Sequence, residues 1–311
     1  MQREPHSSLV VAPVAWRMAQ LSVLFLFDIA RLSRGDGDLL EPVILTAILQ
    51  ANQAALLSDP SQQLRYDDAA WALPDEDRRP ISINAIAQSL GLPFETVRRR
   101  AKALAGRGLC VITPAGVYVP QAAVTATAYV RVQAERAARL AALHGALVAA
   151  DMLAPSPGLE GFIVHAARAA DRQLANYMLR ACGGLLDLTG SAMDGMILVA
   201  LAAANIAELR VERVSDWATF GTLAQPCNAS RLSEMLGMSN ETVRRRLHGL
   251  EAAGFCRRVP GGWTAAIPPG RHALLGRQVT ENAQNLRRLF AALAELHARA
   301  GADAQSAGGA R

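Results

Sequence analysis

The sequence predicts a mainly helical protein with small β-hairpins, built from two copies of one unit. The six residues Glu-Thr-Val-Arg-Arg-Arg occur twice, at Glu95–Arg100 and at Glu241–Arg246. A hexamer rarely recurs by chance, so this repeat, 146 positions apart (241 − 95), indicates an internal duplication. Alanine and leucine dominate the composition and aromatic residues make up only 5% of it, which favours helices over sheets.

The hexamer lies inside a longer frame of matched residues. At the offset of 146, Leu90, Gly91, Leu104, Gly108, Cys110, Pro114 and Gly116 match Leu236, Gly237, Leu250, Gly254, Cys256, Pro260 and Gly262. Further upstream the offset is 153, and there Ile44, Ala47, Ala51, Asn52, Ala54 and Leu56 match Ile197, Ala200, Ala204, Asn205, Ala207 and Leu209. The difference of seven residues (153 − 146) predicts an inserted loop in the first copy, between about Leu57 and Trp71.

The duplication predicts two consecutive domains. We expect an N-terminal extension at 1–14, a first domain at 15–153, a linker at 154–159, a second domain at 160–300 and a disordered tail at 301–311. Each domain then has about 140 residues, which is enough for a hydrophobic core of its own. The linker contains Ala154-Pro155-Ser156-Pro157-Gly158, a composition typical of a short connection.

Hydrophobic periodicity and turn residues predict the same order of elements in both copies. In the first copy we expect helices at Val14–Leu32, Leu39–Leu57, Ile83–Leu90, Pro93–Gly106 and Val124–Ala150, and strands at Leu109–Thr113 and Val117–Val119. In the second copy we expect helices at Phe162–Leu188, Met193–Leu209 and Arg271–Arg299, a helix that starts at Ser239, and strands at Phe255–Val259 and Trp263–Ile267. Two helices joined by a tight glycine turn and followed by a β-hairpin form a winged helix-turn-helix.

The second of these motifs resembles a known family. Residues Arg231–Gly254 closely resemble the DNA-binding domains of cyclic-AMP-receptor and Fnr-type bacterial regulators, and Asn84–Gly108 resembles them more loosely. No part of the chain resembles a cyclic-nucleotide-binding barrel. The flanking helices resemble those of MarR-type regulators, in which the outer helices form a dimer interface. The resemblance implies two winged helix-turn-helix domains arranged as an internal pseudo-dimer.

The helix that carries the hexamer has an apolar face and a polar face. The apolar face consists of Val97, Ala101 and Leu104 in the first copy and of Val243, Leu247 and Leu250 in the second. The polar face consists of Glu95, Arg99 and Lys102 in the first copy and of Glu241, Arg245 and His248 in the second. A major groove admits such a helix, because arginine can donate two hydrogen bonds to guanine and glutamate can accept one from cytosine.

The resemblance implies which side chains contact the bases. In the receptor-type family a glutamate and the arginine four residues later do so, which by position implies Glu95 with Arg99 and Glu241 with Arg245. That family has an arginine before the glutamate, whereas this chain has Phe94 and Asn240 there, so the base preference at that step is open. The expected DNA-contacting residues are Glu95, Thr96, Arg98, Arg99, Arg100 and Lys102 in the first copy, and Asn240, Glu241, Thr242, Arg244, Arg245, Arg246, His248, Arg257 and Arg258 in the second.

The charge distribution agrees with a polyanion as partner. The net charge is +5, and the stretch from Glu95 to Arg107 holds five cations and one anion. The alternative is that a glutamate and an arginine four residues later form an ordinary surface ion pair, worth only ~0.3–0.5 kcal/mol. Because both copies carry the same unusual run, we favour DNA binding.

We therefore expect a bacterial transcription regulator, in which one chain reads two similar half-sites about one helical turn apart on double-stranded DNA. A plasmid replication initiator and a winged-helix scaffold for protein partners are the alternatives. An enzyme is not expected, because the sequence contains no nucleophile elbow, phosphate loop or dinucleotide fingerprint. A homodimer of whole chains stays open. By analogy with MarR-type proteins a small-molecule effector is conceivable, with Trp71 and Trp217 either in its pocket or anchoring the core.

The remaining expectations concern packing and location. Cys110 and Cys256 occupy equivalent positions without any Cys-x-x-Cys pair, so we expect buried thiols, no metal site and no cofactor. We expect Asn52 and Asn205 to be buried amides that bond across a helix interface, and the repeated His144 and His297 to be packing or surface groups. No leader precedes the first helix, and no apolar run reaches the ~20 residues of a membrane span, so we expect a cytoplasmic protein without a membrane partner.

Overall fold

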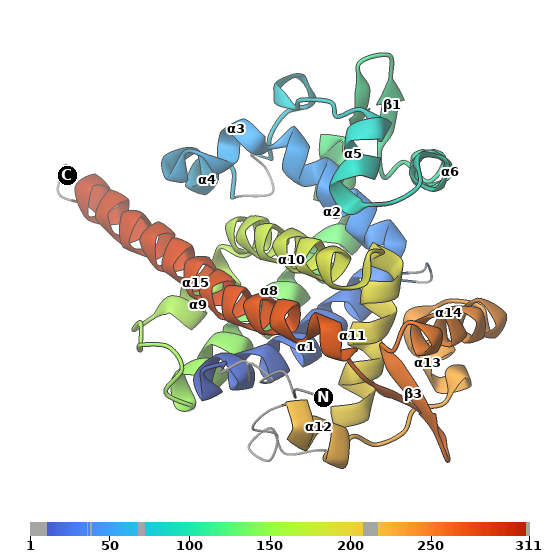
Figure 1. Cartoon of the computed structure of the whole chain (residues 1–311). Coiled ribbons are helices and arrows are strands. Elements are labelled where there is room, and N and C mark those ends of the chain that lie inside the picture. Colours follow the sequence, from blue (N-terminus) through green and yellow to red (C-terminus); the bar gives the residue numbers. More distant parts are fainter. Residues whose placement is uncertain (1–10, 36, 38, 68–71, 208–216, 309–311) are drawn as a thin grey trace. The chain divides into compact units, whose positions relative to one another are not determined.

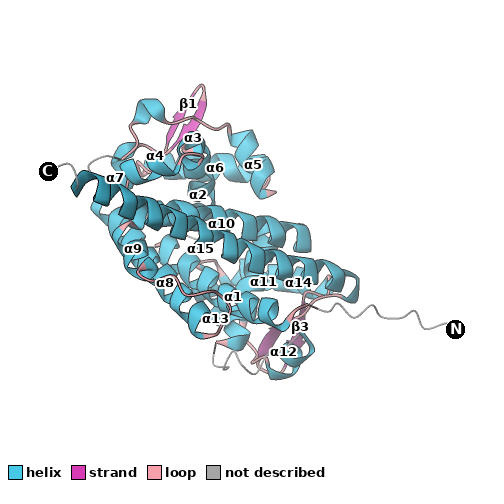
Figure 2. Cartoon of the chain, turned by 90° about the vertical axis from the view of Figure 1, so that its left-hand side faces the viewer, coloured by secondary structure: helices cyan, strands magenta, loops and turns pink. Residues whose placement is uncertain are grey.

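The structure is a computed structural model that describes residues 11–35, 37, 39–67, 72–207 and 217–308. The chain forms two compact units: Met1–Leu24 with Ile197–Gln284, and Phe25–Met196 with Asn285–Arg311. These units are interleaved along the chain, whereas the domains predicted at 15–153 and 160–300 are consecutive. The fold is mainly helical, with two small antiparallel hairpins, as the sequence predicts (Figures 1 and 2).

The larger unit contains the first winged motif. Its elements up to the first hairpin are α1 (Pro13–Arg34, which begins in the smaller unit), α2 (Leu40–Asn52), α3 (Ala54–Leu57), α4 (Pro60–Arg65), η2 (Asp75–Asp77), α5 (Ile83–Leu90), α6 (Phe94–Gly106), β1 (Val111–Thr113) and β2 (Gly116–Tyr118). They are followed by α7 (Gln121–Thr125), α8 (Thr127–Ala149), α9 (Leu159–His165) and α10 (Ala167–Thr189). We call α5, α6, β1 and β2 the first module (Figure 1).

The smaller unit contains the second winged motif. Its elements are α11 (Ala192–Ile206, which begins in the larger unit), α12 (Trp217–Leu223), α13 (Ala229–Leu236), α14 (Asn240–Ala252), β3 (Cys256–Val259), β4 (Gly262–Ala265), η4 (Pro269–Arg271) and the first part of α15 (His272–Gly308). We call α13, α14, β3 and β4 the second module.

The helix-turn-helix of each module is defined by caps at its ends. Ser82 and Asn228 cap α5 and α13 by accepting hydrogen bonds from backbone N–H groups at 3.1 and 2.8 Å. Gly91 and Gly237 end these helices in the left-handed conformation, with φ of 58° and 64°. The same type of residue therefore turns the chain into α6 and into α14.

Each hairpin is held against the strand-like residue that precedes its module. Ile81 bridges Val117 of β2, and Cys227 bridges Trp263 of β4. The backbone of each hairpin lies very close to that residue. A Cβ built at Gly262 would lie 2.3 Å from the carbonyl oxygen of Cys227, and one built at Gly116 would lie 2.6 Å from the carbonyl oxygen of Ile81. Only glycine fits at these two positions.

The predicted apolar faces of the two long helices of the modules are buried. Val97, Ala101 and Leu104 of α6 are at most 1% exposed, and Val243, Leu247 and Leu250 of α14 are at most 3% exposed. In the first module this face packs into a core with Ile44 and Ile48 of α2 and Val117 of β2. Burying this stripe leaves the opposite face of each helix at the surface.

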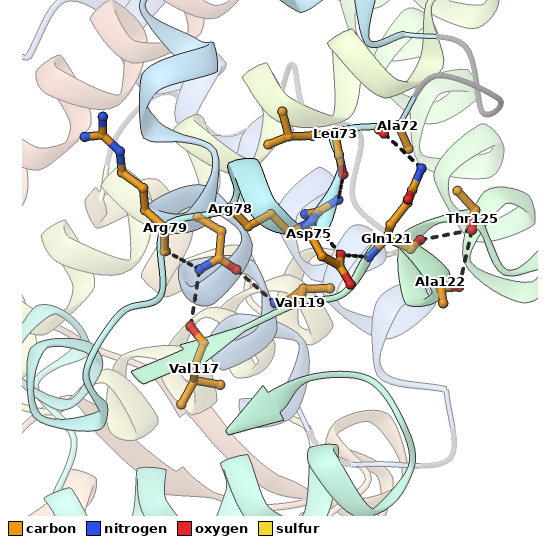
Figure 3. A network of polar contacts seen from close by, with 11 residues as sticks. Ala72, Leu73, Asp75, Arg78, Arg79, Val117, Val119, Gln121, Ala122 and Thr125 are labelled. Carbon is orange, nitrogen blue, oxygen red and sulfur yellow. Dashed lines mark hydrogen bonds and ion pairs between the residues drawn. The ribbon is translucent and has the colours of Figure 1, made fainter. Parts of the chain in front are cut away.

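The predicted buried amides are confirmed, but their partners are backbone groups rather than a neighbouring helix. Asn52 is 2% exposed and Asn205 is fully buried. Asn52 Nδ2 donates to the carbonyls of Arg79 and Val117, and its Oδ1 accepts from Val119 N (Figure 3). These bonds join the end of α2 to the segment just before α5 and to the second hairpin strand. The helix predicted to run to Leu57 ends at Asn52, and α3 follows it.

Other element boundaries also differ from the prediction. The inserted loop contains α4, because Asp59 accepts from the N–H groups of Ser61 and Gln62 and Pro60 occupies the first helical turn. The helix predicted at Val124–Ala150 is divided at Ala126, whose φ of −58° and ψ of 136° are not helical. Helix α15 continues to Gly308, into the stretch for which a disordered tail is predicted.

The repeated histidines are packing groups. His144 is 2% exposed, lies 4.9 Å from the ring of Phe290 and shares a 2.6 Å hydrogen bond with Glu160. That bond lowers the pKa of the Glu160 carboxyl. His297 packs at 5.1 Å against the ring of Phe162.

Helix α1 is long and apolar enough, by length and composition, to span a membrane, and 39% of its most apolar window is buried. A further candidate among the described helices arises only if α10 and α11 are counted as one broken span. Core helices of soluble proteins pass the same test. In α1, Ile29 is fully buried and Asp28 pairs with Arg139 at 2.6 Å, as expected for a helix packed against other helices.

Candidate nucleic-acid interface

Helix α14 presents a polar face to solvent. Glu241, Arg244, Arg245 and His248 are exposed, while Thr242 and Arg246 are half-buried. Residues three and four apart lie on one side of a helix, so these exposed side chains form a single strip. The strip contains one carboxylate, two guanidiniums and one imidazole, which suits hydrogen bonding to base edges.

The start of α14 is fixed by hydrogen bonds. Ser239 caps the helix, accepting from Thr242 N at 3.3 Å, and its hydroxyl lies 2.8 Å from that of Thr242. The Asn240 side chain donates to the Ser230 hydroxyl of α13 at 2.9 Å. These bonds order Asn240 and Thr242, two of the residues that the sequence predicts to contact DNA.

A groove of about 450 Å³ lies between the start of α13, helix α14 and the tip of the second hairpin. Its walls include Arg244 and Arg258, and none of its lining residues is acidic. Asn228 and Ser230 also line it, although the sequence analysis did not select them. The signal for them was present, because Asn228 is the helix cap of α13. A positively charged groove with hydroxyl and amide groups matches the oxygens of a phosphate backbone.

The second hairpin contributes two exposed arginines, Arg257 and Arg258. The Arg258 guanidinium lies 5.4 Å from the centre of the Trp263 ring, which holds the long side chain along the hairpin. His248 is also tethered here, by Glu251 at 3.4 Å and by the edge of the Trp263 ring at 5.9 Å. The hairpin therefore places fixed cations next to the exposed strip of α14.

In the first module the equivalent charges are largely paired. Arg98 donates two hydrogen bonds to Glu95, at 2.7 and 2.8 Å. These bonds lower the pKa of Glu95 and raise that of Arg98. The pair has a spacing of three residues, not the four considered from the sequence. Each oxygen of Glu95 therefore already accepts one hydrogen bond from Arg98.

A second acidic residue acts on the same helix from α2. Glu41 is bound by Arg100 at 3.3 Å and by Arg107 at 2.5 Å. Arg100 is among the residues expected to contact DNA, whereas Glu41 could not be found from the sequence, because the two are 59 positions apart. The exposed cations of α6 without such a carboxylate contact in the described structure are Arg99 and Lys102. Thr96 is half-buried near the start of the helix.

The first hairpin also lacks the cations of the second. Val111 and Ile112 take the places of Arg257 and Arg258, and Ile112 is 41% exposed. At the start of α6, Phe94 replaces Asn240 and is 49% exposed. The first module is thus less cationic and more apolar at its surface than the second.

The comparisons with known proteins single out the second module. Residues 224–267 match the family described as the DeoR-like helix-turn-helix domain. This stretch contains α13, α14 and the β3–β4 hairpin. The chain carries a DeoR-like DNA-binding domain. No curated protein and no solved structure matches the chain.

The exposed strip of α14 lies within this DNA-binding domain. The first module lies outside the matched stretch, so DNA binding by this module stays a prediction from the repeat. The resemblances to Fnr-type and MarR-type regulators also stay predictions. Trp71 lies outside the described residues, as does the side chain of Trp217, so their predicted roles stay open.

The cysteines of both modules are buried, as predicted. Cys110 and Cys256 are each 2% exposed, and each thiol lies 3.4 Å from a backbone carbonyl, that of Ala101 or of Leu247. Burial raises the pKa of Cys110 to about 11 and that of Cys256 to about 12. In the described part of the chain no three His, Cys, Asp or Glu side chains gather as metal ligands.

Proposed function

We propose that this protein is a bacterial transcription regulator that binds specific double-stranded DNA, with α14 of the DeoR-like domain in the major groove. The observation that carries the proposal is the exposed strip of α14 beside a groove whose charged lining residues are all arginines. In this proposal Arg245 donates to a guanine and Glu241 accepts from a cytosine. Arg244 and Arg258 bind phosphates and set the register of the helix on the duplex.

The first module is, in our proposal, a second and weaker reader in the same chain. Its support is the repeated sequence together with the repeated local geometry, which includes the caps, the close glycine and the buried asparagine. The two half-sites would be similar but not identical, because the first module has Phe94 and Lys102 where the second has Asn240 and His248. Since Glu41 and Glu95 bind three of its arginines, the first module would add less affinity than the second.

Selection of binding sites from random duplex DNA tests this function. We would compare the wild type with Arg245→Glu, Arg99→Glu and a control, Arg287→Glu, which makes the same charge change at an exposed site on α15. The wild type and the control should select a two-part motif. Arg245→Glu should lose both parts, and Arg99→Glu should keep one part and lose the other.

A scaffold for protein partners is the second candidate function. The exposed Phe94 and Ile112 of the first module favour it, because large apolar side chains at a surface often mark protein contacts. Selection of no motif by any of the four proteins would move the assignment to this function. Selection of a single replication origin from genomic fragments would instead favour a plasmid initiator.

Neither candidate function requires catalysis, and we propose no enzymatic activity. A regulator that binds chromosomal DNA works in the cytoplasm, which is where we place this protein. The small-molecule effector considered from the sequence remains a proposal, and a specific place for one is argued next.

A further inference from the structure

A small cavity with several charged side chains in its lining lies in the larger unit between α2, α8 and α10. Its volume is about 40 Å³, and its lining includes three arginines, Arg136, Arg168 and Arg172, but a single carboxylate, Asp171. A water needs about 10–15 Å³ of such space, so the cavity has room for a few waters or one small ion. It is too small for a whole drug-sized ligand, for which pockets measure about 300–1,000 Å³.

The single carboxylate of the cavity wall is already saturated. Asp171 accepts from Arg136 at 2.8 Å, from Gln133 at 3.1 Å and from the Tyr129 hydroxyl at 3.4 Å. Arg136 also lies 2.8 Å from its second oxygen. Asp171 and Arg136 therefore neutralise each other, and Asp171 has little left to offer the other two arginines.

Arg168 and Arg172 are deeply buried and bond mainly to neutral groups. They are 8% and 6% exposed. Arg168 donates to the carbonyl of Val124 at 3.4 Å, and Arg172 donates to the carbonyls of Tyr66 and Gln63. The Nε atom of each has no acceptor within the described structure. Burial lowers the pKa of Arg172 to about 10, so it is still charged at neutral pH.

An excess of positive charge remains when Asp67 and the N-terminal end of α10 are taken into account. Asp67 attracts both guanidiniums, but it caps α10 by accepting from Ala169 N at 2.6 Å, and burial raises its pKa. Arg168 lies in the first turn of α10, where the helix end carries partial positive charge of its own. Two carboxylates, Asp67 and Asp171, thus stand against three arginines, and because an uncompensated buried cation is costly, an anion in the cavity would relieve the imbalance.

We propose that this cavity binds a small oxyanion, the carboxylate or phosphate group of an effector, through Arg168 and Arg172. A guanidinium presents its donors in a fixed fork that matches such oxygens. The amide oxygen of Gln53, which lines the cavity, also has no partner within the described structure. A flip of that amide would turn its N–H groups toward the anion.

The cavity is coupled to the first module through the end of α2. Gln50 of α2 donates to the carbonyl of Arg172 at 2.7 Å, and Asn52 ends the same turn two residues later. Asn52 in turn donates to the carbonyls of Arg79, just before α5, and of Val117 in β2 (Figure 3). We therefore expect a change at the cavity to reach the hairpin of the first module. This coupling rests on the proposed DNA-binding function, whereas binding of the anion does not.

Thermal unfolding of the full chain without DNA tests the site by itself. We would add inorganic phosphate or sodium acetate, against sodium chloride at equal ionic strength. At least one oxyanion should raise the unfolding temperature by about 3 °C or more once its concentration is well above its Kd. Phosphate acting alone identifies a phosphate group, and acetate acting alone identifies a carboxylate. No difference from chloride with either salt overturns the proposal.

Variants on α10 show whether the effect arises in the cavity. Arg168→Met should weaken binding of the active anion by about tenfold or more, because a charge-assisted hydrogen bond is lost. Arg180→Met removes an exposed arginine of the same helix and should bind the anion like the wild type. If Arg168→Met does not fold, Arg168→Lys keeps the charge but loses the fork and should also bind more weakly. Equal binding by wild type and the folded Arg168 variant contradicts the site.

DNA binding by the wild type, with and without the active anion, then tests the coupling. We expect the anion to change affinity for the two-part motif by several-fold and to leave Arg168→Met unaffected. If the anion binds in the cavity but the protein binds no DNA, the proposed function fails and the site stands. If the protein binds DNA and neither oxyanion stabilises it, the site fails and the function stands.

Discussion

Asn52 and Asn205 make the same three hydrogen bonds, each near the C-terminal end of its helix, α2 or α11. Each side chain donates to one carbonyl in the segment just before its module and to one in the second hairpin strand, and accepts from the N–H two residues further along that strand. For Asn205 these partners are Gln225, Trp263 and Ala265, at 2.6, 3.1 and 2.8 Å. One buried amide thus positions the hairpin in both modules.

Removing this amide should destabilise the protein. Asn205→Leu leaves two carbonyls and one N–H without their buried partner, which costs about 1–3 kcal/mol. We expect the same for Asn52→Leu. Urea unfolding measures the loss, with Gln88→Leu, an exposed amide on α5, as the control that should change stability little. Unfolding midpoints equal to the wild type would show that the asparagines do not hold the hairpins.

The arginines of the second module should separate into two classes when changed to alanine. Arg245→Ala should weaken the free energy of binding to the preferred DNA sequence by about 1–3 kcal/mol and relax selectivity at one base pair. Arg258→Ala should weaken binding to all sequences alike and reduce the slope of log affinity against log salt by about 1. Fluorescence anisotropy at several salt concentrations measures both effects. Loss of selectivity in Arg258→Ala would contradict the assignment of this residue to phosphate.

Neutralising Glu41 should strengthen non-specific DNA binding. In Glu41→Gln, the neutralising charge beside Arg100 and Arg107 is lost, so this end of α6 attracts phosphates more strongly. The salt slope should then become steeper by about 1 to 2. The matched control is Glu76→Gln, an exposed acid of η2 without a described ion pair. An unchanged slope in Glu41→Gln would show that α6 does not approach DNA.

The buried thiols should be unreactive in the folded protein. Burial raises the pKa of Cys110 to about 11 and that of Cys256 to about 12, so very little thiolate exists at pH 8. Their raised pKa values add stability below pH 9, and this is lost as pH rises toward 11 to 12. Ellman's reagent should label these two residues only on unfolding. Rapid labelling of Cys110 or Cys256 in the native protein at pH 8 would contradict their burial.

Much of the fold follows from local signals in the sequence. The glycine turns, the caps and the apolar stripe of α14 each depend on residues within a few positions of one another, and the helices and hairpins lie where those signals place them. The division at Ala126 and the helix capped by Asp59 were missed. The division at Ala126 has no glycine or proline to mark it. The helix capped by Asp59 is short and lies inside a stretch predicted to be a loop.

The candidate site was harder to predict where it depends on distant residues. The exposed strip of α14 is a property of one helix, so its residues could be named from the sequence. The pairing of Arg100 with Glu41 joins α6 to α2, and the groove beside α14 needs α13 and the hairpin together. Such contacts depend on tertiary packing, for which a helix wheel carries no signal.

The most direct test of the central claim is a genome-wide pull-down of bound DNA fragments, in wild type and in the Arg99→Glu/Arg245→Glu double variant. We predict that the wild type enriches a two-part, imperfectly palindromic motif and that the double variant does not. Enrichment of the same motif by both proteins, or of no motif by the wild type, would contradict DNA recognition by these helices.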